Sequence, residues 1–210
     1  MKLIGSETSP YVRKVRVYLG EVGIDCDFGI VDAWKPASSL LEFAPIGKVP
    51  VLVRNQSDPL YESNLIIEYL ESLLPVEKRL VPASGEHRWQ VLRLQALATG
   101  MIDATATRTV ELRKPPATQS SVVLDRELRR IERLLALFEK SVESRPAYLV
   151  DNKKSTADLV LGVALQYLDF RHTPEWRSSA QSLAAWFAPI ALRPTFTSTQ
   201  PPGFVPPATL

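Results

Sequence analysis

The chain begins with a short apolar run and then a helical pattern. Residues 2–4 suit a first β-strand. A helix follows, because apolar residues then recur at the spacing of one helical face: Val12, Val15, Leu19 and Val22. Ser9 is a favourable N-cap, Pro10 suits the first helical position, and Gly23 stands where a C-terminal cap belongs. The pattern predicts strand, turn and helix, with a serine hydroxyl at the helix N-terminus.

Short strand patterns and a second helix continue to residue 74. Residues 25–31 predict a second strand, and 47–53 predict a third strand that is entered through a proline. Residues 55–59 carry a turn signal and 60–61 a short fourth strand, after which a helix opens at 62–64. The order β-α-β and then β-β-α predicts an α/β layer arrangement of thioredoxin type.

The remainder of the chain has a helical texture. We expect a thioredoxin-like domain at 1–75, a linker at 76–86, and an all-α helical domain at 87–210 that ends in a proline-rich tail. Residues 124–142 form an amphipathic pattern whose charge run is most simply solvated, and 159–165 have no polar face, so that helix should be buried. Just before it, Ser155-Thr156-Ala157-Asp158 has the form of a capping box.

Composition and charge remove several function classes. The 210 residues carry 25 Lys plus Arg against 23 Asp plus Glu, and a net charge of +2 argues against nucleic acid as the main partner. No apolar run approaches a membrane span, so we expect no membrane association. Residues 1–4 lead directly into turn residues, so we expect no signal peptide. The single cysteine suits a reducing, cytoplasmic setting, and the two histidines show no metal-ligand spacing, so we expect no metal.

Two side chains are candidates for chemistry, each beside a plainer role. Ser9 lies where free backbone N–H groups and the helix dipole favour an anion or a thiolate, although most serines at this position only cap a helix. Cys26 stands between Asp25 and Asp27 in a strand pattern, and their charges would raise the pKa of its thiol. We therefore interpret Cys26 as an ordinary strand residue rather than a reactive thiol.

Four motifs in order resemble the glutathione S-transferase superfamily, especially its bacterial members with a serine at the active-site turn. These motifs are residues 8–15, residues 45–52, Glu62-Ser63, and the capping box at 155–158, and together they cover essentially the whole chain. The resemblance implies a cytoplasmic, homodimeric detoxification transferase. Its glutathione co-substrate would bind to the thioredoxin-like domain, and the helical domain would supply most of the pocket for a small electrophile.

The resemblance also implies a set of glutathione contacts. Val49 would pair its backbone with the peptide ligand next to a cis Val49–Pro50 bond. Glu62 would pair with the γ-glutamyl ammonium and Ser63, at a helix start, with the α-carboxylate. Lys35 would pair with the glycyl carboxylate, and Lys48 either does the same or faces solvent. Each has a plainer reading too, as a trans proline turn, a helix cap or a solvated lysine.

The resemblance to this superfamily favours the interpretation of Ser9 as the catalytic residue. Its hydroxyl would donate to the glutathione sulfur and favour the thiolate, with Thr8 as the alternative hydroxyl and Tyr11 as a residue that could line the pocket. Serine cannot form the mixed disulfides of family members with cysteine at this turn. This favours addition of the thiolate to an electrophile, or peroxide reduction by glutathione alone.

Two other functions stay open at this point. One is a non-catalytic glutathione-binding or scaffold protein of the same fold, and the other is a glutathione-dependent isomerase or dehalogenase. A helix expected at about 89–111 should face the active site. No substrate role is assigned to the residues on one of its faces: Met101, Thr105, Arg108 and Leu112.

Overall fold

The computed structural model describes residues 1–32, 35, 40–55, 57–144, 147–171 and 174–207, with the backbone alone at 42–43. These residues form two compact units. The first unit consists of Met1–Ala83 and Pro194–Phe204, and the second consists of Ser84–Arg193 and the stretch that starts at Val205. The first unit thus contains a segment from near the end of the chain.

A four-stranded mixed sheet organises the first unit. The strand order is β2-β1-β3-β4, with β1 parallel to β2 and antiparallel to β3, and with β3 antiparallel to β4. The strands are β1 Lys2–Gly5, β2 Asp27–Ile30, β3 Val51–Arg54 and β4 Ser57–Tyr61. The helices of this unit are α1 Pro10–Val22, α2 Leu40–Phe43, α3 Ser63–Ser72, the 3-10 turn η1 Val76–Lys78, and α8 Pro194–Thr197. The predicted thioredoxin-type order is confirmed.

The turn between β3 and β4 is shorter than the sequence predicts. Ser57, Asp58 and Pro59 were expected in the turn but lie in β4. Arg54 holds this end of the hairpin, because its Nε and Nη2 donate to the backbone oxygen of Asp58 at 3.0 and 2.7 Å. The residues expected to break the strand therefore extend it.

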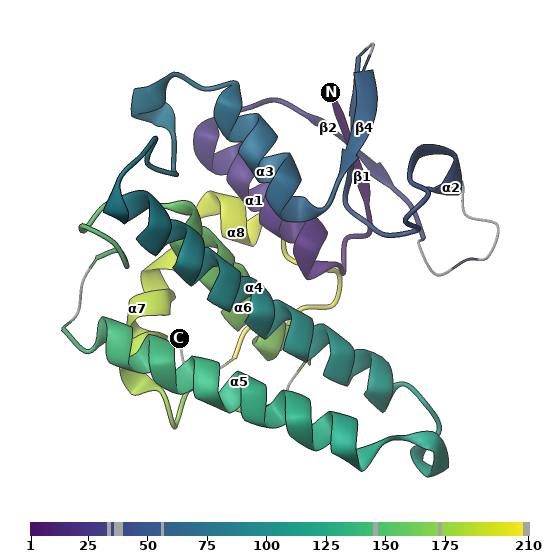
Figure 1. Cartoon of the computed structure of the whole chain (residues 1–210). Coiled ribbons are helices and arrows are strands. Elements are labelled where there is room, and N and C mark those ends of the chain that lie inside the picture. Colours follow the sequence, from purple (N-terminus) through teal and green to yellow (C-terminus); the bar gives the residue numbers. More distant parts are fainter. Residues whose placement is uncertain (33–34, 36–39, 56, 145–146, 172–173, 208–210) are drawn as a thin grey trace. The chain divides into compact units, whose positions relative to one another are not determined.

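Helix α1 forms where the local signals predict it. Ser9 is the N-cap, Pro10 is the first helical residue, and Gly23 closes the helix with φ 71°, a conformation that glycine adopts without strain. The turn from β1 is tight: a Cβ on Gly5 would lie 2.4 Å from Cγ2 of Val12. Figure 1 shows α1 and α3 side by side, and contacts between the two helices confirm their packing.

The segment from Pro194 to Phe204 packs on α1 rather than with the helical unit that precedes it. Arg13 is 4% exposed, and its guanidinium donates to the backbone oxygen of Phe196 at 2.9 Å and to Oγ1 of Thr199 at 3.3 Å. Burial, with the charge of Arg16 as a lesser cause, lowers the pKa of Arg13 to about 10. Glu21 accepts from Thr195 at 2.5 Å, so polar bonds hold both ends of α1 to this segment.

The second unit is helical. Its elements are α4 Glu86–Leu112, the 3-10 turn η2 Pro116–Thr118, α5 Ser121–Val142, α6 Thr156–Arg171 and α7 Gln181–Ala191. Helix α6 is buried continuously from Thr156 to Asp169 and packs against α4, as its lack of a polar face predicts. Figure 1 shows α4 and α5 alongside each other. Neither these nor the other helices in the described ranges are long and apolar enough to cross a membrane.

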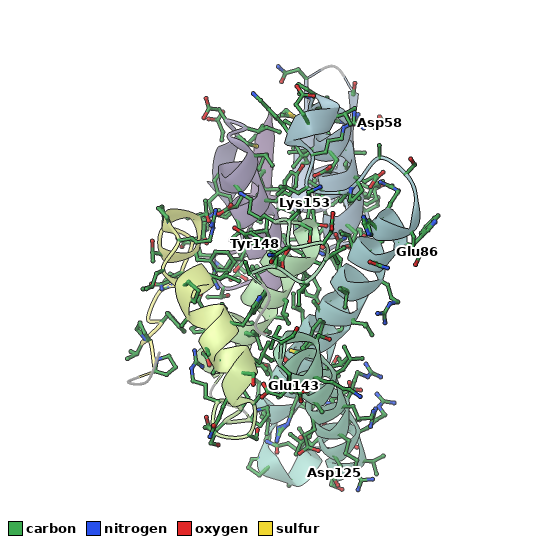
Figure 2. All side chains as sticks on the ribbon, turned by 90° about the vertical axis from the view of Figure 1, so that its left-hand side faces the viewer. Asp58, Glu86, Asp125, Glu143, Tyr148 and Lys153 are labelled. Carbon is green, nitrogen blue, oxygen red and sulfur yellow. The ribbon has the colours of Figure 1, made fainter. Side chains whose placement is uncertain are left out.

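The predicted capping box opens α6. Asp158 is 1% exposed, and its Oδ2 accepts from the backbone N of Ser155 at 2.8 Å and from Ser155 Oγ at 2.7 Å. Its Oδ1 accepts from the backbone N of Leu149 at 2.8 Å, which ties the preceding loop to the helix start. Figure 2 labels Tyr148 and Lys153 in this loop. One carboxylate therefore serves both the helix and the loop.

The charge run of α5 is not wholly solvated. Glu127 is 1% exposed, and its carboxylate lies 2.9 Å from Nε of Arg126 and 3.0 Å from Nη1 of Arg130. Farther along the helix, Glu139 accepts from the backbone N–H groups of Ser182 and Leu183 at 2.9 and 2.7 Å. The latter bonds cap α7, whose own N-cap residue supplies no side-chain bond. Two of the acids in α5 thus have structural partners.

Candidate functional site

Ser9 lies at the start of α1 with its side chain partly exposed. Its Oγ accepts from the backbone N of Val12 at 3.3 Å. A hydroxyl has one proton to donate besides its acceptor lone pairs, so capping leaves that proton available. The first turn of α1 contains no acidic residue that would repel an anion. Capping and stabilisation of a thiolate are therefore compatible at this oxygen.

The neighbouring hydroxyl, Thr8, is exposed and lies before the helix. Its Oγ1 is 3.2 Å from Oγ of Ser6, and its backbone N donates to the same Ser6 oxygen at 3.4 Å. Thr8 is thus engaged within the turn, whereas Ser9 belongs to the helix start. Tyr11 lies in the first turn of α1 and is partly buried.

Glu62 and Ser63 lie together at the start of α3. Glu62 is the N-cap, with φ 81°, and accepts from the backbone N of Asn64 at 3.0 Å and of Leu65 at 3.4 Å. Ser63 is 1% exposed and donates from Oγ to Oε1 of Glu62 at 3.1 Å. The capping acid and the buried serine therefore form one polar group at a helix N-terminus, where the dipole favours an anion.

Val49 lies just before the start of β3. There Val51 pairs with Tyr61, the residue that precedes Glu62, so the start of β3 lies beside the end of β4 in the antiparallel ladder. The Val49–Pro50 peptide bond is cis, as the sequence analysis predicts. Val49 itself is partly buried against the small apolar cluster of Leu40, Ala44 and Val51.

The two candidate lysines are both exposed. Lys35 is described singly, since its neighbours 33–34 and 36–39 lie outside the described residues, and its backbone N lies 3.4 Å from the oxygen of Asp32. Lys48 directly precedes Val49.

The four residues on one face of α4, Met101, Thr105, Arg108 and Leu112, differ in burial. Met101 is 0% and Thr105 1% exposed, and Leu112 is exposed. Arg108 differs from them, because its Nε and Nη1 are buried without a hydrogen-bond partner among the described residues. Buried guanidinium nitrogens without an acceptor are costly, which makes Arg108 a candidate for contact with an anion.

Cys26 and the residue types that bind metals give no second candidate site among the described residues. Cys26 is partly buried and lies just before β2, whereas the sequence predicts it within the strand. Burial is the main cause that raises the pKa of its thiol, and the charge of Asp27 is only a lesser cause. Within the described ranges, His, Cys, Asp and Glu do not gather into a group of three that could hold a metal ion.

Sequence reasoning missed Lys14 and Asn64. Lys14 is 1% exposed, and its Nζ donates to Oδ1 of Asn64 at 2.8 Å. This bond joins the second turn of α1 to the first turn of α3, so the N-termini that carry Ser9 and Glu62 lie at the same end of the helix pair. A signal did exist: Lys14 shares a helix face with Pro10 and Tyr18 and has no acid one turn away.

Comparison with known proteins gives a consistent family. The family described as glutathione S-transferase, N-terminal domain, matches residues 3–79, and the corresponding C-terminal domain matches residues 121–188. The uncharacterized GST-like protein YibF of Escherichia coli K12 is 34% identical over 208 residues, which cover 96% of this chain and 99% of that protein.

Solved structures agree. A glutathione S-transferase from Methylobacillus flagellatus with glutathione bound is 35% identical, with a TM-score of 0.89 over 95% of this chain and 98% of that one. A glutathione transferase family member from Pseudomonas fluorescens Pf-5 with bound S-(propanoic acid)-glutathione is 34% identical, with a TM-score of 0.83 over 96% of this chain and 100% of that one. From both domain matches, the full-length relative and these folds, we conclude that the chain belongs to the glutathione S-transferase superfamily.

Proposed function

We propose that the protein is a glutathione transferase in which Ser9 stabilises the glutathione thiolate. The observation that carries this proposal is the Ser9 hydroxyl, which accepts from Val12 and keeps its proton for a sulfur anion. Lowering a thiol pKa by about two units requires roughly 2.7 kcal/mol. A hydrogen bond to a charged group supplies about 1.5–3 kcal/mol, and the helix N-terminus adds to it.

The rest of glutathione would extend along the first unit. Glu62 would bind the γ-glutamyl ammonium, Ser63 the α-carboxylate, the backbone of Val49 the central peptide, and Lys35 the glycyl carboxylate. Glutathione bound in the Methylobacillus flagellatus structure and the glutathione conjugate bound in the Pseudomonas fluorescens structure support this ligand. From the family resemblance we also propose a homodimer in the cytoplasm.

We propose further that the electrophile carries a carboxylate. Arg108 has two buried nitrogens without an acceptor, and a guanidinium pairs with a carboxylate through parallel hydrogen bonds. The propanoic acid conjugate bound to the Pseudomonas fluorescens protein supports this class of substrate. In the reaction, the thiolate would form a carbon–sulfur bond to the electrophile. An activated alkene would then gain a proton at the adjacent carbon, whereas a halide would leave.

The test is the thiolate absorbance of the enzyme–glutathione complex against pH. In Ser9→Ala we expect the pKa of the bound thiol to rise by about one to two units, while glutathione affinity stays within a few-fold. Turnover near neutral pH should fall roughly ten- to a hundredfold and recover as the pH rises. Thr8→Ala is the matched control. A wild-type titration in Ser9→Ala with a shifted one in Thr8→Ala would transfer the role to Thr8, and binding without turnover would favour a glutathione-binding protein.

A further inference from the structure

The hydrogen bond between Lys14 and Asn64 fixes the orientation of an amide. The ammonium of Lys14 can only donate, so the oxygen of the Asn64 side chain must face it, at 2.8 Å. The amide nitrogen is thereby turned the other way, and it donates to Oε1 of Glu62 at 3.1 Å. A buried cation on α1 thus sets which group of Asn64 meets the carboxylate of Glu62.

The two oxygens of Glu62 differ as a result. Oε1 accepts from three donors at 3.0–3.1 Å, which are the backbone N and Nδ2 of Asn64 and Oγ of Ser63. Oε2 has one longer contact among the described residues, 3.4 Å from the backbone N of Leu65. Glu62 is exposed, so Oε2 remains open to a ligand although the carboxylate is held at its other oxygen.

We propose that Lys14 and Asn64 are positioning residues that orient Glu62 so that Oε2 receives the ammonium of a γ-glutamyl ligand. This rests on the proposed binding of glutathione. An exposed glutamate would otherwise lose rotamer freedom when the ligand binds, and here that freedom is restricted beforehand. The arrangement selects ligands that carry a free primary ammonium at this end, because a blocked amine has no charge to pair with Glu62.

Asn64→Asp separates this role from helix packing. The aspartate has nearly the same shape and still accepts from Lys14, so the link between α1 and α3 is kept, but it cannot donate to Glu62. We expect the glutathione Kd to rise roughly tenfold, with kcat at saturating glutathione within about threefold of wild type. Asn55→Asp, the same change at an exposed turn residue of this unit, should alter neither quantity.

A second experiment compares the affinities for two ligands, because a purely structural role of Asn64 would weaken both ligands equally. Calorimetry with glutathione and with N-acetylglutathione, in which the amine is blocked, measures the preference for the ammonium. We express this preference as the Kd of N-acetylglutathione divided by the Kd of glutathione, and we expect Asn64→Asp to lower this ratio about tenfold. In a Glu62→Gln background Asn64→Asp should add less than about twofold, because the charge that it orients is already gone. Lys14→Met removes the donor that holds the amide oxygen of Asn64, and it should lower the same ratio of Kd values. This variant replaces Asn64→Asp as the test if Asn64→Asp does not fold.

The outcomes separate two failures. If the wild-type protein binds glutathione and both Asn64→Asp and Lys14→Met keep the full preference over N-acetylglutathione, the positioning role is overturned and the proposed function stands. Equal weakening of both ligands, or additive effects of Asn64→Asp and Glu62→Gln, also overturns it. If the wild-type protein does not bind glutathione at all, the proposed function fails and this inference fails with it.

Discussion

At the scale of single residues, the polar groups of this protein serve more than one partner. Ser9 accepts from a backbone N–H group and keeps a proton, and Glu62 caps α3 through one oxygen more firmly than through the other. Arg108 differs from these two residues, because two of its nitrogens are buried without an acceptor among the described residues. We expect a buried guanidinium of this kind to gain its hydrogen-bond acceptor only when a substrate is bound.

The prediction for Arg108 uses two electrophiles of similar shape, acrylate and acrylamide. Arg108→Gln should lower kcat/KM for acrylate by roughly tenfold or more, since a charge-assisted bond is lost, and should change the value for acrylamide little. Arg93→Gln is the control, because Arg93 is an exposed arginine on the same helix. Equal losses for the two electrophiles would remove Arg108 from carboxylate binding.

At the scale of elements, sequence signals correctly predicted the helix ends that are formed by contacts between residues close together in the chain. Ser9, Pro10 and Gly23 bound α1 as expected, and Ser155 and Asp158 open α6, because each of these signals acts within one helical turn. The lysine–asparagine bond and the cap of α7 by Glu139 join residues 50 and 43 positions apart and leave no pattern along the chain. For the candidate site, the sequence named Ser9, Glu62 and Ser63 but not what orients them.

The capping carboxylate of α6 gives a pH prediction. Burial raises the pKa of Asp158 above its ordinary value of 3.8, although hydrogen bonds from Leu149 and Ser155 act in the opposite sense. Above about pH 4 the unfolded chain has lost this proton while the folded chain still holds it, up to the folded-state pKa. The contribution of Asp158 to stability therefore falls as the pH rises through that window.

The measurement is the free energy of unfolding in urea at several pH values. The difference between wild type and Asp158→Asn should shrink as the pH rises from about 4 and then level off. Asp125→Asn, a change at an exposed position of α5 that Figure 2 labels, should give a difference without this slope. A difference that grows with pH in the same window would contradict the raised pKa.

At the scale of the whole molecule, the first unit is built from two segments that are far apart in the sequence, Met1–Ala83 and Pro194–Phe204. Ending the chain after Arg193 would remove the oxygens of Phe196 and Thr199 to which the Arg13 guanidinium donates, together with the buried ring of Phe196. We expect this truncation to lower the unfolding free energy of the first unit by about 3 kcal/mol or more. Urea unfolding measures the loss, with a chain ended after Pro207 as the control. Equal stability of the two chains would show that the segment on α1 is dispensable.

The return of this segment to α1 has a consequence for synthesis on the ribosome. The sheet, α1 and α3 leave the exit tunnel first, but the piece that accepts from Arg13 is translated only after the whole helical unit. At ordinary elongation rates this delay is on the order of ten seconds. A nascent chain can therefore hold Ser9 and Glu62 without a finished first unit around them, and we expect competence for the ligand to arise only after residues 194–204 have been synthesised.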